Sequence, residues 1–141
     1  MKNLLSMLLV FSFLFTIGCE DDDATESELN PLVGVWNMTS IVIESEGTTT
    51  IDADDDYNMV IIFNEDGTFS NQGAFDGESH SETGTWSTSE NKLTIITDDV
   101  AEGEETDIWD YTLSGNSFLS MTIAENEGGY DFTYTYNFTK G

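Results

Sequence analysis

The sequence is poor in cationic side chains. Its 141 residues contain three lysines and no arginine, against 28 acidic residues, and the formal net charge is −25. A surface of this composition is repelled by the phosphate backbone of nucleic acids and by anionic membrane surfaces. Nucleic-acid binding is therefore excluded.

Histidine and cysteine are equally scarce, with one of each. This excludes a zinc site, which needs several such ligands. His80 lies between Ser79 and Ser81 in a polar stretch, and nothing around it resembles a nucleophile turn. We expect His80 to lie in an exposed loop. An enzyme would need a pocket that converges on His80, and paired carboxylates arise by chance in so acidic a chain. We therefore expect no catalytic residue and no enzymatic activity.

Two acidic stretches raise the question of a metal site. The first, Asp52 to Asp56, resembles the start of an EF-hand loop, but Tyr57 stands where glycine is needed and Phe63 where the bidentate glutamate should be. We expect no metal site and no cofactor. Weak association of Ca²⁺ with clustered carboxylates remains an alternative to plain solvated loops. It would involve the first stretch or the second, which comprises Asp98, Asp99, Glu102, Glu104 and Glu105.

The N-terminus carries the most specific signal. After Lys2, an apolar run from Leu4 to Phe15 leads to Thr16-Ile17-Gly18-Cys19. The run is shorter than the roughly 20 residues that span a bilayer, but suits a signal peptide. The segment resembles the bacterial lipobox, although leucine is usual where Thr16 stands. The resemblance implies a signal peptide over residues 1–18, a lipid (palmitate) on Cys19, and anchoring in the outer membrane.

The next four residues are all acidic: Glu20, Asp21, Asp22 and Asp23. They resemble the surface-export signal of Bacteroidota lipoproteins, which implies a place on the cell surface. Like charges repel one another, so this segment should be extended whether it is a signal or only a linker. We expect an acidic tether over residues 19–28 and a single domain over 29–141.

The remainder of the chain predicts an all-β domain. No stretch after residue 30 keeps a helical period, and turn signals recur about every 11 to 13 residues, which is typical of an antiparallel meander. We expect an up-and-down barrel of eight to nine strands, because closure removes free strand edges. The predicted strands are 33–44, 47–52, 57–64, 68–75, 80–88, 92–98, 106–113, 117–124 and 130–139.

The last predicted strand has one aromatic face, formed by Tyr130, Phe132, Tyr134, Tyr136 and Phe138. Polar residues alternate with them, so we expect this face to point inward, with Tyr134 lining a cavity or its mouth. Buried tyrosine hydroxyls need partners, which a wet cavity or a ligand would supply; a packed core with hydroxyls at its rim is the alternative. The candidate ligand-binding residues are Trp109, Tyr111, Tyr130, Tyr134 and Tyr136.

Short motifs in order along the chain resemble a known family. Leu32-Val33-Gly34-Val35-Trp36 resembles the Gly-x-Trp opening of lipocalins, and two further pieces, 63–69 and Gly84-Thr85-Trp86 followed by 92–95, fit lipocalin-like lipoproteins of Bacteroidota. The resemblance implies a calycin-type barrel in which Trp36 plugs the closed end and Gly34 allows close backbone approach. It also gives Gly84 and Trp86 structural roles. The arginine motif of long-chain lipocalins has no counterpart here.

These observations predict a monomeric, lipid-anchored barrel that binds a small hydrophobic or amphipathic ligand. The alternative is a non-enzymatic interaction or structural lipoprotein, whose filled barrel presents acidic loops to partner proteins, glycans or Ca²⁺. The interior distinguishes the two, because a filled barrel has no site for a ligand.

Overall fold

The computed structural model describes residues 28–99 and 103–141. The predicted signal peptide, Cys19 and the acidic run Glu20 to Asp23 lie outside the described residues. Within the described ranges no helix is long and apolar enough to cross a membrane.

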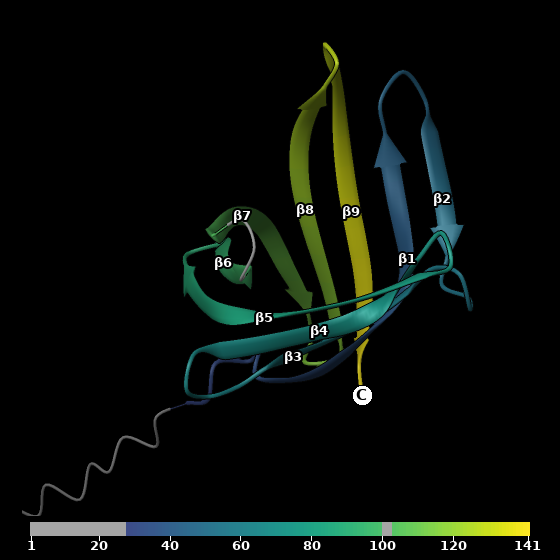
Figure 1. The fold of residues 1–141 in the computed structure, drawn as a ribbon. Helices are drawn as coiled ribbons and strands as arrows, with labels where there is room; N and C mark the ends of the chain where they lie inside the picture. The colour runs from purple at the N-terminus through teal and green to yellow at the C-terminus, as the bar shows by residue number, and fades with distance from the viewer. Residues whose placement is uncertain (1–27, 100–102) are drawn as a thin grey trace, which may run out of the picture.

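The described residues form nine strands and no helix (Figure 1). Every predicted strand is present. The largest differences are at β7, which begins at 103 rather than 106, and at β8, which ends at 127 rather than 124. The strands are β1 (Gly34–Glu44), β2 (Thr48–Asp52), β3 (Asn58–Phe63), β4 (Thr68–Phe75), β5 (Glu78–Ser89), β6 (Lys92–Asp99), β7 (Gly103–Ser114), β8 (Phe118–Glu127) and β9 (Tyr130–Lys140).

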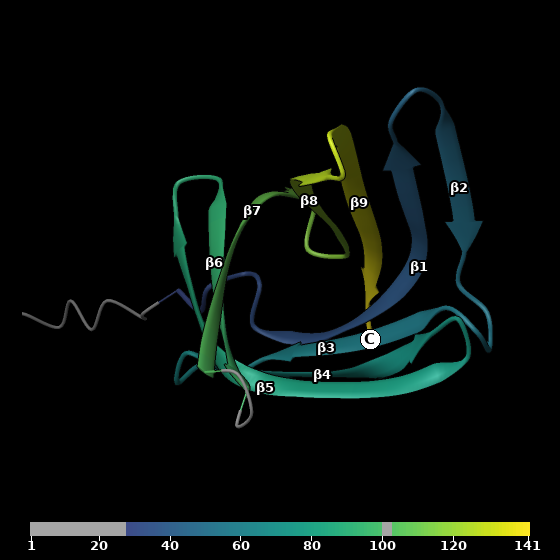
Figure 2. The same cartoon turned by 45° about the horizontal axis from the view of Figure 1, so that its top comes forward.

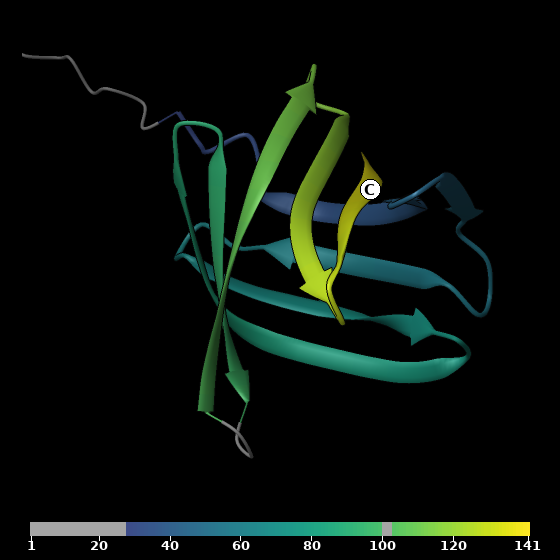
Figure 3. The same cartoon turned by 90° about the horizontal axis from the view of Figure 1, so that it is seen from above.

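Eight of the strands close into an antiparallel barrel. From β3 to β9 each strand pairs with the next, and β1 closes the ring by pairing with both β3 and β9. Figures 2 and 3 show β3, β4 and β5 crossing the direction of β7, β8 and β9 steeply, as expected in a small, strongly twisted barrel. The predicted all-β barrel is confirmed.

β2 is additional to the barrel. The first half of β1, Gly34 to Asn37, pairs with β3, and its second half, Ser40 to Glu44, pairs with β2 along the same edge. A register shift between Met38 and Ser40, opposite β9, marks the change. Such a bulge bends a strand. The β1–β2 hairpin therefore extends beyond the barrel beside the β8–β9 hairpin (Figure 1).

One end of the barrel is closed around Trp36, and we call it the Trp36 end. Trp36 is fully buried, its indole Nε1 donates a hydrogen bond to the Leu32 carbonyl oxygen at 2.7 Å, and the Lys140 ammonium lies 5.2 Å from its ring centroid. Nearby, Trp86 Nε1 donates to the Asn64 carbonyl oxygen at 3.1 Å, and its ring lies 5.0 Å from that of Phe63.

Two glycines allow close approach near this end. A Cβ at Gly84 would lie 1.9 Å from the carbonyl oxygen of Ile96, which is backbone and cannot move aside easily. Gly34 has φ of +134°, which side chains rarely adopt, and a Cβ there would lie 2.9 Å from Lys140 Cε. Both positions fit the structural roles that the family resemblance implies.

The opposite end is strongly acidic, and we call it the acidic end. It is formed by the β1–β2, β4–β5 and β8–β9 turns and the β2–β3 loop. The two described lysines, Lys92 and Lys140, are at the Trp36 end, one at the start of β6 and the other at the end of β9. The exposed carboxylates at or beside the acidic end include Glu44, Glu46, Asp52, Asp54, Asp55, Asp56, Asp76, Glu78, Asp98, Glu104, Glu105, Glu125, Glu127 and Asp131.

Candidate functional site

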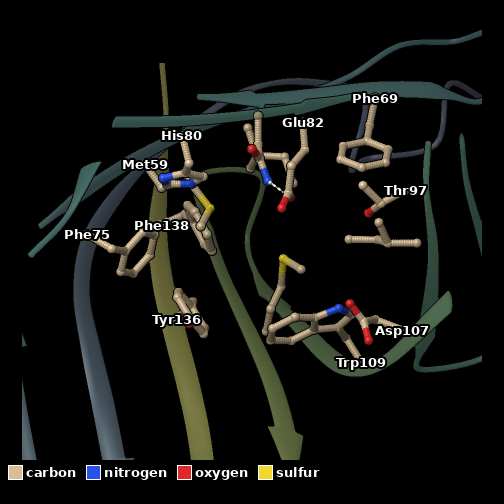
Figure 4. Close-up of a pocket in the computed structure, with 14 residues that line it drawn as sticks. Met59, Phe69, Phe75, His80, Glu82, Thr97, Asp107, Trp109, Tyr136 and Phe138 are labelled. Carbon is tan, nitrogen blue, oxygen red and sulfur yellow. Dashed lines mark hydrogen bonds between the residues drawn. The ribbon is translucent and has the colours of Figure 1, made fainter. Parts of the chain in front are cut away.

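The barrel interior contains a cavity of about 300 Å³ (Figure 4). Seven strands, β3 to β9, contribute side chains to it. The interior is therefore not filled, which favours the ligand-binding alternative. The lining residues are Met59, Ile61, Phe69, Asn71, Phe75, His80, Glu82, Ile95, Thr97, Asp107, Trp109, Met121, Tyr136 and Phe138.

One wall of the cavity is apolar. Met59 and Ile61 extend from β3, Met121 from β8, and Tyr136 and Phe138 from β9. Ile61, Met121 and Phe138 are buried, because they lie on the inward face of strands whose alternate residues face out. This wall offers hydrocarbon and aromatic surface to a bound molecule.

The wall formed by β4 to β7 contains the polar residues of the lining, beside Phe69, Phe75, Ile95 and Trp109. Asn71, His80, Glu82, Thr97 and Asp107 occupy inward positions on these four neighbouring strands. Asn71 Nδ2 donates a hydrogen bond to Glu82 Oε2 at 2.9 Å, which Figure 4 marks by a dashed line. The cavity is thus amphipathic, a combination that suits a ligand with one polar and one apolar part.

Three buried polar atoms have no hydrogen-bond partner within the described part of the chain: Asn71 Oδ1, His80 Nδ1 and Trp109 Nε1. All three belong to residues that line the cavity. An unsatisfied buried polar atom costs about 1–3 kcal/mol. A molecule in the cavity that supplied their partners would remove this cost, so the cavity is the candidate binding site.

A row of rings crosses the cavity from β5 to β7. The ring of His80 lies 4.9 Å from that of Phe75, Phe75 lies 6.3 Å from Tyr136, and Tyr136 lies 5.6 Å from Trp109. Burial, followed by the carboxylate of Glu125, raises the pKa of Tyr136 to about 12. Its hydroxyl therefore stays protonated at neutral pH and can donate a hydrogen bond to a ligand.

Asp107 is a carboxylate in the cavity lining, two residues before Trp109 on β7. Burial raises its pKa above the ordinary aspartate value, and the neighbouring carboxylate of Glu82 raises it further. No lysine or arginine lines the cavity to offset either charge. Asp107 is thus held in a position that disfavours its charged form.

We predict that Asp107→Asn raises the thermal midpoint of unfolding at pH 7. A carboxyl with a raised folded-state pKa binds its proton more tightly when folded, so above that pKa its charge disfavours folding. The stability gain should shrink as the pH falls towards about 3, below the ordinary aspartate pKa of about 3.9. Calorimetry across this range tests it. Asp52→Asn, the same substitution at an exposed position of β2 outside the lining, is the matched control, and an equal rise in both variants contradicts the prediction.

The structure places the five predicted ligand-binding residues differently. Trp109 and Tyr136 line the cavity. Tyr111 packs against the core, and its hydroxyl donates to the Glu90 carbonyl oxygen at 3.3 Å. Tyr134 is half-buried outside the lining, with its hydroxyl 3.5 Å from Glu127 Oε1, and Tyr130 is 62% exposed. The predicted inward position holds for Tyr136 and Phe138, but it is wrong for Tyr130, and Tyr134 does not line the cavity. The reason is that the β8–β9 hairpin continues past the barrel (Figure 1).

The expectation for His80 is also wrong. It is not in an exposed loop but within β5, half-buried, beside Phe75 and in the cavity lining. The polar residues Asn71, Glu82, Thr97 and Asp107 were not singled out from the sequence. The alternation of β7 could have identified Asp107, because residues two apart in a strand share a face and Asp107 therefore lies on the same face as Trp109 and Tyr111.

The first acidic stretch is used to build a loop. Asp54 Oδ1 accepts hydrogen bonds from the backbone N–H groups of Asp56 and Tyr57, at 2.9 and 2.8 Å, and the Tyr57 hydroxyl donates to Asp76. Within residues 28–99 and 103–141, no three histidine, cysteine or acidic side chains are placed to hold a metal ion.

Comparison with known proteins identifies the family of the barrel. Residues 32–120 match the lipocalin-like domain, whereas no curated protein matches the chain. A lipocalin-like protein from Bacteroides uniformis has a similar structure, with 21% identity and a TM-score of 0.53 over 79% of this chain and 100% of that one. An uncharacterized protein from Bacteroides eggerthii has 14% identity and a TM-score of 0.50 over 78% and 99%. At these identities the two structures show a shared fold alone.

Proposed function

Since the chain belongs to the lipocalin-like domain family, we propose that its barrel binds a small hydrophobic or amphipathic molecule without transforming it. The observation that carries this proposal is the amphipathic cavity, with three unpartnered polar atoms in its lining. Its volume of about 300 Å³ is at the lower limit of typical small-molecule sites. The ligand is therefore small.

A non-enzymatic role fits the chemistry of the lining. His80, Glu82 and Asp107 all line the cavity, but no hydrogen bond joins any two of them in the described chain. The lining contains no serine or cysteine, and its hydroxyl groups belong to Thr97 and Tyr136. A nucleophile paired with a base, the usual sign of covalent catalysis, is not present among these residues.

Filling part of the cavity should weaken ligand binding. Thr97→Phe adds a ring to the lining, and this ring occupies space that a ligand would fill. We expect the variant to bind the neutral apolar dye N-phenyl-1-naphthylamine about tenfold more weakly or worse. The apolar contact area that the dye loses to the ring is worth about 1.4 kcal/mol or more. Dye fluorescence titration measures the change. Thr85→Phe, the same substitution at an exposed position of β5 outside the lining, is the matched control.

Equal dye affinity in Thr97→Phe and the parent would place the dye outside the cavity and contradict the proposal. Native mass spectrometry of protein purified from its own host provides the complementary measurement. A co-purifying small molecule that is lost in Thr97→Phe but kept in Thr85→Phe would be the natural ligand.

We further propose that the barrel is a monomer held at the outer surface of the outer membrane by a lipid on Cys19. The support for this is the sequence alone: the apolar run that ends in Gly18-Cys19, and the four acidic residues from Glu20 to Asp23 that follow. Each buried CH₂ group contributes about 0.8 kcal/mol, so two or more acyl chains give stable anchoring.

A further inference from the structure

The two carboxylates that line the cavity, Glu82 and Asp107, are not matched by any cation there. They extend from β5 and β7 into the same space (Figure 4). The lysines of the described chain are used at the Trp36 end, where Lys92 pairs with Asp110 at 2.7 Å and Lys140 donates to the Pro31 carbonyl oxygen at 3.2 Å. Neither lysine lines the cavity.

The surroundings of these carboxylates favour a positively charged guest. Asn71 already donates its amide N–H to Glu82, and its Oδ1 remains as an unpartnered acceptor beside them. An ammonium group carries only donors, which match carboxylate and amide oxygens. The rings of Trp109 and Phe75 also line this space, and aromatic faces attract cations.

The wall of Ile61, Met121 and Phe138 supplies the apolar half of the site. A hydrocarbon chain placed there would cover surface that otherwise faces the cavity. We propose, as an extension of the ligand-binding function above, that the cavity selects amphipathic organic cations: amines with a short hydrocarbon tail, whose charged head lies at Glu82 and Asp107. The tail then packs on the apolar wall.

The charge distribution over the whole barrel supports this selection. The cavity residues His80, Phe75 and Met59 lie near the strand ends at the acidic end, so a ligand that enters from that end passes exposed carboxylates and meets no lysine of the described chain. Fields of one sign around a site concentrate ligands of the opposite sign and repel those of the same sign. Anionic amphiphiles such as fatty acids are disfavoured both at the entrance and inside.

The experiment compares three probes that share one tail and differ in charge: octylamine, 1-octanol and octanoate. Each competes with N-phenyl-1-naphthylamine on the full domain at about 0.15 M salt, where attraction to distant surface charges is screened beyond about 8 Å. We expect octylamine to bind about tenfold more tightly than octanol, the lower end of the usual gain from hydrogen bonds to charged groups, because Glu82 is exposed to solvent. Octanoate should bind most weakly.

Two double variants separate the cavity from the overall net charge. Glu82→Gln with Asp107→Asn should reduce the preference for octylamine over octanol to about twofold or less. Glu44→Gln with Asp52→Asn removes the same number of charges from exposed positions outside the lining, and should leave the preference intact. The single variants Glu82→Gln and Asp107→Asn repeat the test if the double variant does not fold.

Each remaining outcome overturns a distinct statement. If octanol and octanoate compete as well as octylamine, the cavity binds ligands but does not select cations, and this inference fails while the proposed function stands. If both double variants lose the preference equally, it arises from net charge, and the inference also fails. If neither the dye nor any probe binds, the ligand-binding function itself fails.

Discussion

Replacement of Trp36 by alanine is expected to lower the free energy of unfolding by about 3–5 kcal/mol, the usual cost of truncating a buried aromatic side chain. Trp36 is fully buried, and its indole N–H donates to the Leu32 carbonyl oxygen at 2.7 Å. Truncation therefore removes packing at the Trp36 end and leaves that carbonyl without its indole donor. Urea denaturation followed by circular dichroism measures the loss.

Tyr130→Ala is the control for Trp36→Ala, since Tyr130 is 62% exposed and surface substitutions usually change stability by about 0.5 kcal/mol or less. Trp36→Phe should fall between the two, because a ring remains but the hydrogen bond is lost. A loss below about 1 kcal/mol in Trp36→Ala would show that the plug is dispensable and that the interior relaxes around its absence.

Cys19→Ala is expected to move the protein almost completely from the membrane fraction to the soluble fraction. The proposed acyl chains are attached through this thiol, and two or more such chains are what gives stable anchoring. Fractionation of cells, with intact-mass measurement of the purified protein, checks both the location and the missing lipid. Membrane association and mass increments that persist in Cys19→Ala would rule out Cys19 as the site of lipidation.

Replacement of Glu20 to Asp23 by alanine separates lipidation from export. This variant should keep the lipid and stay in the membrane fraction, but should become protected from protease added to whole cells. If it remains as accessible as the parent, the acidic run is a spacer and not an export signal.

The strands were predictable from sequence because their signals are local. Turn residues such as Asp66-Gly67 and Asp76-Gly77 limit each run, and the described structure has Gly67 and Gly77 at positive φ. The point along β9 at which its aromatic face leaves the barrel interior was not predictable, because it depends on where the neighbouring strands end. Phe138 is 2% exposed and Tyr130 is 62% exposed on the same face of one strand.

The polar half of the cavity escaped prediction for a different reason. The start of β5, Glu78-Ser79-His80-Ser81-Glu82, is polar on both faces, so alternation gave no sign of which side chains face inward. In β7, hydrophobicity alone would place Ile108 inside, yet it is 58% exposed. Because Trp109 faces inward, every second residue of β7 faces inward with it, and no single residue can change face without a shift of the whole strand. Asp107 is carried inward as a result.

The pairing of β1 with β9 also determines how the chain must fold. Trp36 lies opposite Lys140 in this pairing, and Asn137 Nδ2 donates to Ser40 Oγ at 3.2 Å across a separation of 97 residues. Closing so large a loop costs chain entropy before the β1–β9 contacts form and stabilise the barrel. We therefore expect folding to be slow, in the range of about milliseconds to seconds. Until the last strand has been synthesised and docked, β1 and β8 each expose an unpaired edge, and the growing chain is most vulnerable to aggregation during that interval.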